Sequence, residues 1–173
     1  MAIGLVIAGV TLRLMPHMDN FAPVGAIALF AGAILGLRYA LWMPLSIMVV
    51  SDLIIGLHPT IWFTWGGFLL VALFGTLLCN TRNRWRIPLG AAGSAVIFYM
   101  VSNFGVWLEG WLYPPTVQGL VDAYIMALPF LRASFIGDLA FATLLFGLYA
   151  LLAHRLSGHI TLRLRHKRAV NTV

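Results

Sequence analysis

The sequence predicts an all-α membrane protein with six transmembrane helices in one bundle. Of its 173 residues, 61% are hydrophobic and only 9% are charged, and the mean hydropathy is +0.95. A chain this apolar cannot surround a soluble core with a polar surface. Its apolar residues also fall into long segments with no linker or internal repeat between them. We therefore expect one six-helix transmembrane domain over residues 1–156, followed by a basic cytoplasmic tail over 157–173.

Six apolar segments predict the helices in chain order. The first has no basic region at its start and no clear cleavage site, so we interpret it as a retained span rather than a signal peptide. The later segments are separated by "RLMPHMDNFAP", "WMP", "GLHPT", "NTRNRWRIP" and "EGWLYPPTVQGL". Two segments are shorter than the roughly 20 residues that a straight span requires. The predicted helices cover residues 2–14, 23–42, 44–57, 61–79, 88–108 and 134–153.

Small residues within these segments predict how the helices pack. Ala28, Gly32 and Gly36 recur every four residues on the second helix, and Gly4 and Ala8 do so on the first. Small residues at this spacing let two helix backbones approach closely in lipid. The mixed segment between the fifth and sixth helices is too polar for a span. It is interpreted as an amphipathic loop or an interfacial helix over residues 115–131.

The basic residues predict the orientation of the bundle. With the N-terminus inside, nine of the 11 Lys and Arg residues fall in inner breaks or in the tail, and only Arg13 and Arg132 fall outside. Cytoplasmic loops retain Lys and Arg, so both termini are expected in the cytoplasm. We interpret the tail sequence "RLRHKR" as an anchor at anionic lipid headgroups, not as a nucleic-acid site.

Polar side chains concentrate in the outer half of the chain under this topology. All five acidic residues belong to it, and ionisable residues in membrane segments usually line a cavity or pathway. We expect Asp52 and Asp138 to make structural hydrogen bonds or to cap helices. Tryptophans at the outer ends of the fourth and fifth helices form either an interfacial aromatic belt or a wall around a planar ligand.

Four stretches of the sequence resemble the motifs of a transporter family. They are "RLMPHMDNFAPVGAIALFAGA", "SDLIIGLHPT", "SNFGVWLEGWLYPPTVQGL" and "ALPFLRASFIGDLAFATLLFG". Their order and spacing are similar to those of the small BtuM-type vitamin B12 transporters and their relatives, which resemble the S components of energy-coupling-factor (ECF) transporters. The resemblance covers nearly the whole chain. It implies an S-component-like bundle in the bacterial inner membrane that binds cobalamin from the periplasm and has no cofactor of its own.

The resemblance gives the outer polar and aromatic side chains a specific role. The polar groups would bond to the amide rim of a corrin ring, while two tryptophans would cover its apolar edges, as concave ligand sites usually divide this work. The expected substrate-binding residues are His58, Trp62, Asn103, Trp107, Tyr113, Tyr124 and Arg132.

Cys79 is the single cysteine of the chain. A lone cysteine in an apolar segment usually acts as a small hydrophobic residue. The resemblance implies instead that Cys79 ligates the cobalt of cobalamin and assists the loss of cyanide from cyanocobalamin, a role that suits a soft thiolate donor. A straight helix over residues 61–79 would place this sulfur near the cytoplasmic end, far below an outward-facing pocket.

Three other function classes compete with cobalamin uptake. Asp52 and Asp138 could relay protons in a transporter of a small solute. An S component for another vitamin would need an ECF ATPase module as a partner, and the small-residue stripes also fit a scaffold subunit. The lipid bilayer is the partner common to all of them. An enzyme is not expected, because Ser94 and His154 are the only loose candidates for a membrane protease and no third group orients them.

Overall fold

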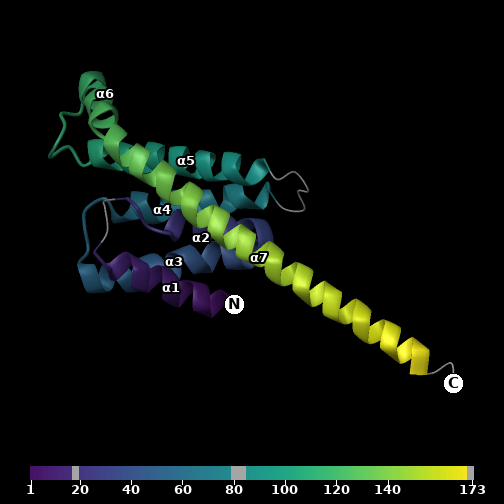
Figure 1. The fold of residues 1–173 in the computed structure, drawn as a ribbon. Coiled ribbons are helices and arrows are strands. Elements are labelled where there is room, and N and C mark those ends of the chain that lie inside the picture. The colour runs from purple at the N-terminus through teal and green to yellow at the C-terminus, as the bar shows by residue number, and fades with distance from the viewer. Residues whose placement is uncertain (17–19, 79–84, 171–173) are drawn as a thin grey trace.

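The computed structural model describes residues 1–16, 20–78 and 85–170, with side chains up to Arg155. These residues form seven α-helices, one short π-helix and no strand (Figure 1). The all-α prediction is therefore confirmed. The elements are α1 (Ala2–Leu14), α2 (Val24–Phe30), the π-helix η1 (Ala31–Leu35), α3 (Leu37–Ile55), α4 (Ile61–Thr76), α5 (Arg86–Leu108), α6 (Val117–Met126) and α7 (Leu128–Val170).

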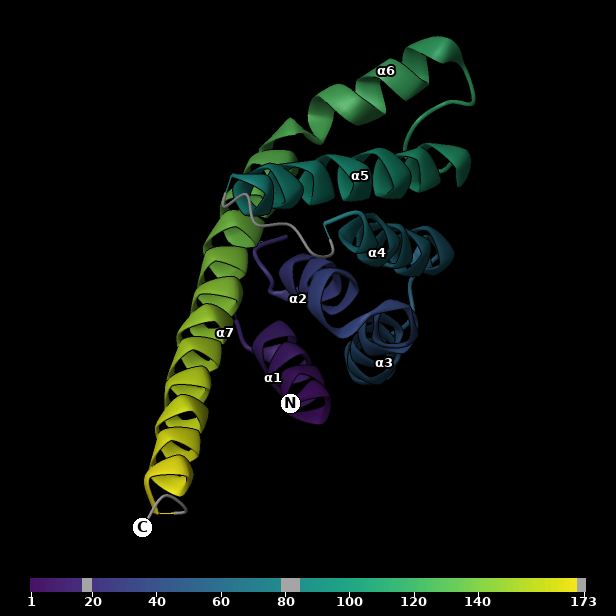
Figure 2. The same ribbon diagram turned by 90° about the vertical axis from the view of Figure 1, so that its right-hand side faces the viewer.

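Helix α2 is the centre of the bundle. All seven of its residues are buried, and it contacts α1, α3, α4, α5 and α7 (Figure 2). Around it, successive helices are roughly antiparallel to one another (Figure 1). Helix α6 lies across one end of the bundle and packs mainly on α5. The faces turned away from α2 carry exposed large apolar side chains such as Ile3, Leu53 and Leu144, as expected for helices surrounded by lipid.

Two glycines bring the backbone of α4 into contact with those of α2 and η1. A Cβ atom on Gly32 would lie 2.0 Å from the carbonyl oxygen of Ala72, and one on Gly75 would lie 2.5 Å from that of Leu29. Only hydrogen fits at either position, so the predicted close approach at Gly32 is present. The rest of the predicted stripes differs. Gly36 lies beyond the helix with φ of +91°, and a Cβ on Gly4 would meet open space.

The prediction of six transmembrane helices holds only in part. Among the described residues, three helices are long and apolar enough to cross a membrane: Leu37–Ile55, Arg86–Leu108 and Leu128–Arg155. Three further apolar helices, Ala2–Leu14, Val24–Leu35 and Ile61–Thr76, have 10–17 residues. At 1.5 Å per residue, a 13-residue helix such as α1 is only about 20 Å long, which is less than the ~30 Å hydrocarbon core.

The helix boundaries expected around Pro44 are wrong. Helix α3 contains Pro44 in its interior, and the break lies instead at Gly36, where the positive φ suits glycine and ends η1. Proline removes one backbone donor but does not end this helix. The helix expected within residues 115–131 is present as α6 (Val117–Met126), but its boundary differs, because α7 already begins at Leu128.

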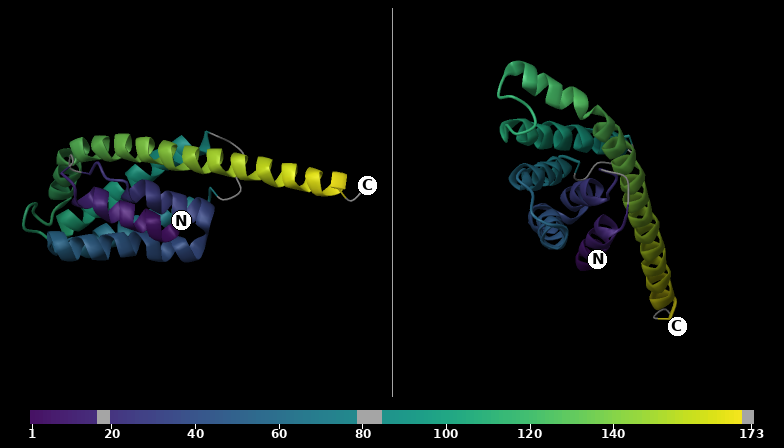
Figure 3. Two further views of the ribbon diagram at one scale, coloured as in Figure 1. Left: turned by 60° about the horizontal axis from the view of Figure 1, so that its bottom comes forward. Right: turned by 90° about the vertical axis from the view of Figure 1, so that its left-hand side faces the viewer.

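Helix α7 is the longest element, with 43 residues. It runs along the bundle and continues well past its end (Figure 3). The predicted boundary between the domain and the tail at residue 157 is therefore not a helix end, because α7 continues to Val170. The N-terminus and the last turn of α7 lie toward the same end of the bundle (Figure 1).

Candidate functional site

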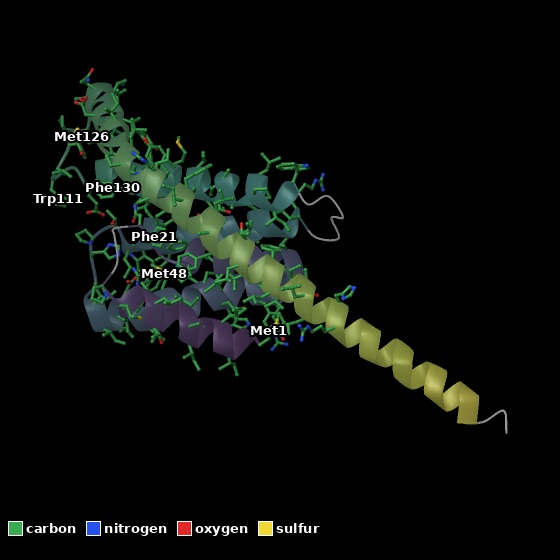
Figure 4. The ribbon with its side chains drawn as sticks, in the orientation of Figure 1. Met1, Phe21, Met48, Trp111, Met126 and Phe130 are labelled. Atoms are coloured by element: carbon green, nitrogen blue, oxygen red, sulfur yellow. The ribbon has the colours of Figure 1, made fainter. Side chains whose placement is uncertain are left out.

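A cavity of about 470 Å³ opens at the end of the bundle opposite Met1. Trp111, Met126 and Phe130 mark this end in Figure 4. The volume lies within the range of about 300–1,000 Å³ that is typical of small-molecule sites. The wall is formed by Arg13, Asn20, Ala22, Val24, Gly25, Ile55, His58, Thr64, Phe68, Phe98, Ser102, Asn103, Val106, Phe130, Ser134 and Asp138.

Helical spacing explains which side chains reach the cavity. On α7 the lining residues are Phe130, Ser134 and Asp138, and on α5 they include Phe98, Ser102 and Val106. Residues four positions apart lie on one face of a helix. Each of these two helices therefore presents a single face, with an aromatic residue at one position and a polar residue at the next.

Asp138 is a nearly buried carboxylate in this wall. Its side chain is 6% exposed, and it accepts a hydrogen bond from the backbone N–H of Ala26 in the first turn of α2. A Cβ on Gly25 would lie 2.3 Å from Asp138 Oδ1, so the carboxylate fits only because residue 25 is glycine. The positive end of a helix favours a negative group at this position. The hydrogen bond to the start of a helix that was expected for Asp138 is thus present.

An ion-pair network lies beside the cavity. The guanidinium of Arg13 donates to Ser51 Oγ and, at 2.5 Å, to Asp52 Oδ1. Trp65 Nε1 donates to the second carboxylate oxygen of Asp52 at 2.7 Å. Asp52 is 1% exposed, and the network joins α1, α3 and α4. Asp52 thus makes the structural hydrogen bonds that were expected of it. Its negative charge offsets the positive charge of Arg13 at the cavity wall.

Two of the expected substrate-binding residues line the cavity. His58 lies in the connection between α3 and α4, and its Nδ1 is 3.0 Å from Thr60 Oγ1. Asn103 lies on α5 and donates from Nδ2 to the carbonyl oxygen of Tyr99 at 2.8 Å. The structure thus brings together one imidazole and one amide of the expected set.

Other expected residues hold α6 and its preceding loop on α5. Trp107 Nε1 donates to the carbonyl oxygens of Pro114 and Thr116, both at 3.2 Å. Tyr124 donates to the carbonyl of Met100 at 2.8 Å, and Tyr99 donates to that of Tyr124 at 2.5 Å. Burial, followed by the nearby Tyr99 hydroxyl, raises the pKa of Tyr124 above its ordinary value of 10.0, so this hydroxyl remains a donor at neutral pH.

The remaining expected residues lie away from the cavity or outside the described structure. Trp62 is 74% exposed at the start of α4 and packs edge-on against Trp65, and Tyr113 is half-buried in the loop before α6. Arg132 lines a separate hollow formed by the first turns of α7. Cys79 lies outside the described residues. Within the part of the chain that is described, no three His, Cys, Asp or Glu side chains are grouped closely enough to hold a metal ion.

The aromatic part of the wall was not predicted from the sequence. Phe68 and Phe98 stack with their ring centroids 4.3 Å apart and an interplanar angle of 23°, and Phe130 lines the cavity from α7. Ser102 and Ser134 were also missed. The sequence did contain a signal for this part of the wall. Ser134 and Asp138 are four residues apart, which places two polar side chains on one face of a mostly apolar helix, and Phe130 lies on the same face.

Comparisons with known proteins identify the family of the chain. No curated protein and no solved structure matches the sequence significantly. The model of a family of unknown function, DUF6580, matches residues 1–161. Because this match covers most of the chain, including every residue that lines the cavity, the protein belongs to the DUF6580 family.

Proposed function

We propose that this protein is the solute-binding component of a membrane transport system, similar to an S component, and that the cavity at the end of the bundle holds the solute. The observation that carries the proposal is Asp138. It is a buried acidic residue that lines a cavity of about 470 Å³ within a bundle of mainly apolar helices. A charged residue at such a position is costly and is usually retained for a ligand or an ion.

The proposed topology has six membrane-crossing helices with both termini in the cytoplasm. The nine-to-two distribution of basic residues supports it, since Arg38, Arg86 and Arg155 lie toward the end opposite the cavity. The shorter helices α1 and α4 would be accommodated by local thinning of the bilayer. The cavity would then open to the periplasmic side of a bacterial inner membrane.

Two observations favour different solutes within this function. The motif resemblance favours cobalamin or a related corrinoid, with Cys79 as a ligand of its cobalt. The volume of the cavity favours a smaller vitamin, because about 470 Å³ suits a drug-sized ligand and a complete cobalamin would extend far beyond the opening. In both cases the protein binds and delivers the solute, and an ECF energising module is the partner proposed to drive its release.

The experiment that tests the function is ligand binding by the full-length protein purified in detergent. Cobalamin binding would be read from the visible absorbance of protein purified from cells grown with cobalamin. Binding of smaller vitamins would be read from the shift in thermal unfolding temperature across a panel of water-soluble vitamins. A colourless protein that none of these vitamins stabilises would contradict the proposed function.

A further inference from the structure

We propose that the cavity selects a small, flat cation that is rich in hydrogen-bond donors, such as an amidine or a protonated amino-heterocycle, and that its charge pairs with Asp138. The inference rests on the proposed solute-binding function and names the chemical class of the solute. It is carried by three features of the wall: its charge, its hydrogen-bonding groups and its aromatic surface.

Asp138 is the acidic side chain of the described wall. The lining contains three titratable side chains: Arg13, His58 and Asp138. The positive charge of Arg13 is offset by Asp52 at 2.5 Å. Asp138 faces the neutral N–H of Ala26, which is a hydrogen-bond donor but supplies no compensating full charge. A cationic solute would supply that charge inside the bundle, where an ion pair is screened far less than at the surface.

Three polar side chains of the wall donate to nearby backbone carbonyls and so offer acceptors to the cavity. The hydroxyl of Thr64 donates to the carbonyl of Thr60, and the hydroxyl of Ser102 donates to that of Phe98 at 2.8 Å. Each donor is thus used within its own helix, so the oxygen lone pairs remain for the cavity. Asn103 uses one amide hydrogen on Tyr99 in the same way. A solute that carries several N–H groups would match these acceptors.

The aromatic surface favours a flat solute. The stacked rings of Phe68 and Phe98 line one part of the cavity, and Phe130 lines another. A planar cation gains dispersion contacts with such rings and is attracted to their faces. A bulky aliphatic amine would satisfy Asp138 but would not use these rings.

The test compares three probes of nearly equal shape. Benzamidine is a flat cation, benzamide is its neutral analogue, and benzoate is its anionic analogue. Their dissociation constants would be measured by calorimetry on the full-length protein in detergent. We expect benzamidine to bind about tenfold or more tightly than benzamide, and benzoate to bind least, because a hydrogen bond to a charged group contributes more than a neutral one. Equal binding of the three probes would overturn the proposed selectivity.

Matched variants locate the effect. Asp138→Asn keeps the shape of the side chain and its acceptor for Ala26, and it should weaken benzamidine binding about tenfold while leaving benzamide unchanged. Asp122→Asn is the control, because Asp122 lies on α6 outside the cavity and bonds to Gln118. A benzamidine affinity that is unaffected by Asp138→Asn would overturn the inference. If Asp138→Asn does not fold, the probe series on the unaltered protein decides.

The outcomes also separate this inference from the proposed function. Binding of a vitamin that carries no cationic group, together with no preference for benzamidine, would overturn the selectivity and support the solute-binding function. Failure of the three probes and of every vitamin in the panel would overturn both.

Discussion

The carboxylate of Asp138 occupies the space that a side chain at position 25 would need. Asp138 Oδ1 lies 2.3 Å from the position of a Cβ atom on Gly25, and the same carboxylate accepts the N–H of Ala26. The absence of a side chain at residue 25 therefore determines where the charged group of the cavity lies. The sequence "PVGA" at the start of α2 and the aspartate on α7 form one structural unit, although they are more than a hundred residues apart.

Gly25→Ala tests this unit directly. The new methyl group would displace the Asp138 carboxylate, so we expect the free energy of unfolding to fall by about 1–3 kcal/mol and solute binding to weaken. Thermal unfolding in detergent measures the first effect. Gly4→Ala is the control, because a Cβ there meets open space and alanine favours the helix. Equal unfolding temperatures for the two variants would contradict the predicted contact.

Gly75→Ala should destabilise the protein more than any exposed glycine substitution. Its Cβ would lie 2.5 Å from the carbonyl oxygen of Leu29, which is backbone and cannot change rotamer. We expect a loss of about 3 kcal/mol, measured as the fraction of folded protein after mild heating. Gly66→Ala lies on the same helix in open space and should unfold at the same temperature as the parent or higher. A stable Gly75→Ala protein would show that α4 is farther from α2 than described.

Asp52→Asn tests the ion pair beside the cavity. Asp52→Asn removes the negative charge from the buried carboxylate that pairs with Arg13, and the loss of stability should be about 3 kcal/mol. The matched control, Asp122→Asn, alters one hydrogen bond on the surface of α6 and should cost only about 0.5 kcal/mol or less. Chemical unfolding monitored by tryptophan fluorescence would compare them, and similar midpoints would argue against the pair.

Asn103→Ala and Tyr124→Phe separate the residues that line the cavity from those that hold α6. Asn103 lines the cavity, so its alanine variant should weaken solute binding by roughly 1–3 kcal/mol. Tyr124 bonds to Met100, so Tyr124→Phe should lower stability by about 1 kcal/mol and leave the affinity unchanged. Solute dissociation constants measured for both variants would distinguish the two roles. A loss of affinity in Tyr124→Phe alone would reverse the two roles.

Cys79→Ala tests the corrinoid alternative. If the Cys79 sulfur ligates cobalt, bound cyanocobalamin should show a shifted visible spectrum and slow loss of cyanide, and the variant should show neither. Thermal unfolding of the variant without ligand is the control for folding. A variant that retains the shifted spectrum would leave Cys79 with a packing role.

The sequence predicts the helical class and the polar end of the bundle because these depend on composition and spacing. It does not predict the helix ends well. Pro44 is a strong local signal for a break, yet the packing of α3 retains it within the helix, and the break occurs at Gly36. Asp138 and Asn103 were recognisable as polar residues of the outer half. That Asn103 lines the cavity whereas Tyr124 holds α6 depends on the tertiary arrangement of α5, α6 and α7, which no local pattern contains.

The backbone contact of α4 with α2 and η1 has a mechanical consequence. The main chain of α4 contacts that of η1 at Gly32 and that of α2 at Gly75. These helices cannot slide past each other without separating, so we expect this side of the bundle to be rigid. Helix α5 instead contacts side chains of α4: its Gly93 lies against Phe74, and its Gly105 lies against Phe63. Aromatic rings can rotate where a main chain cannot. We therefore expect the cavity to adjust to solutes of different width by movement of α5, while its depth stays constant.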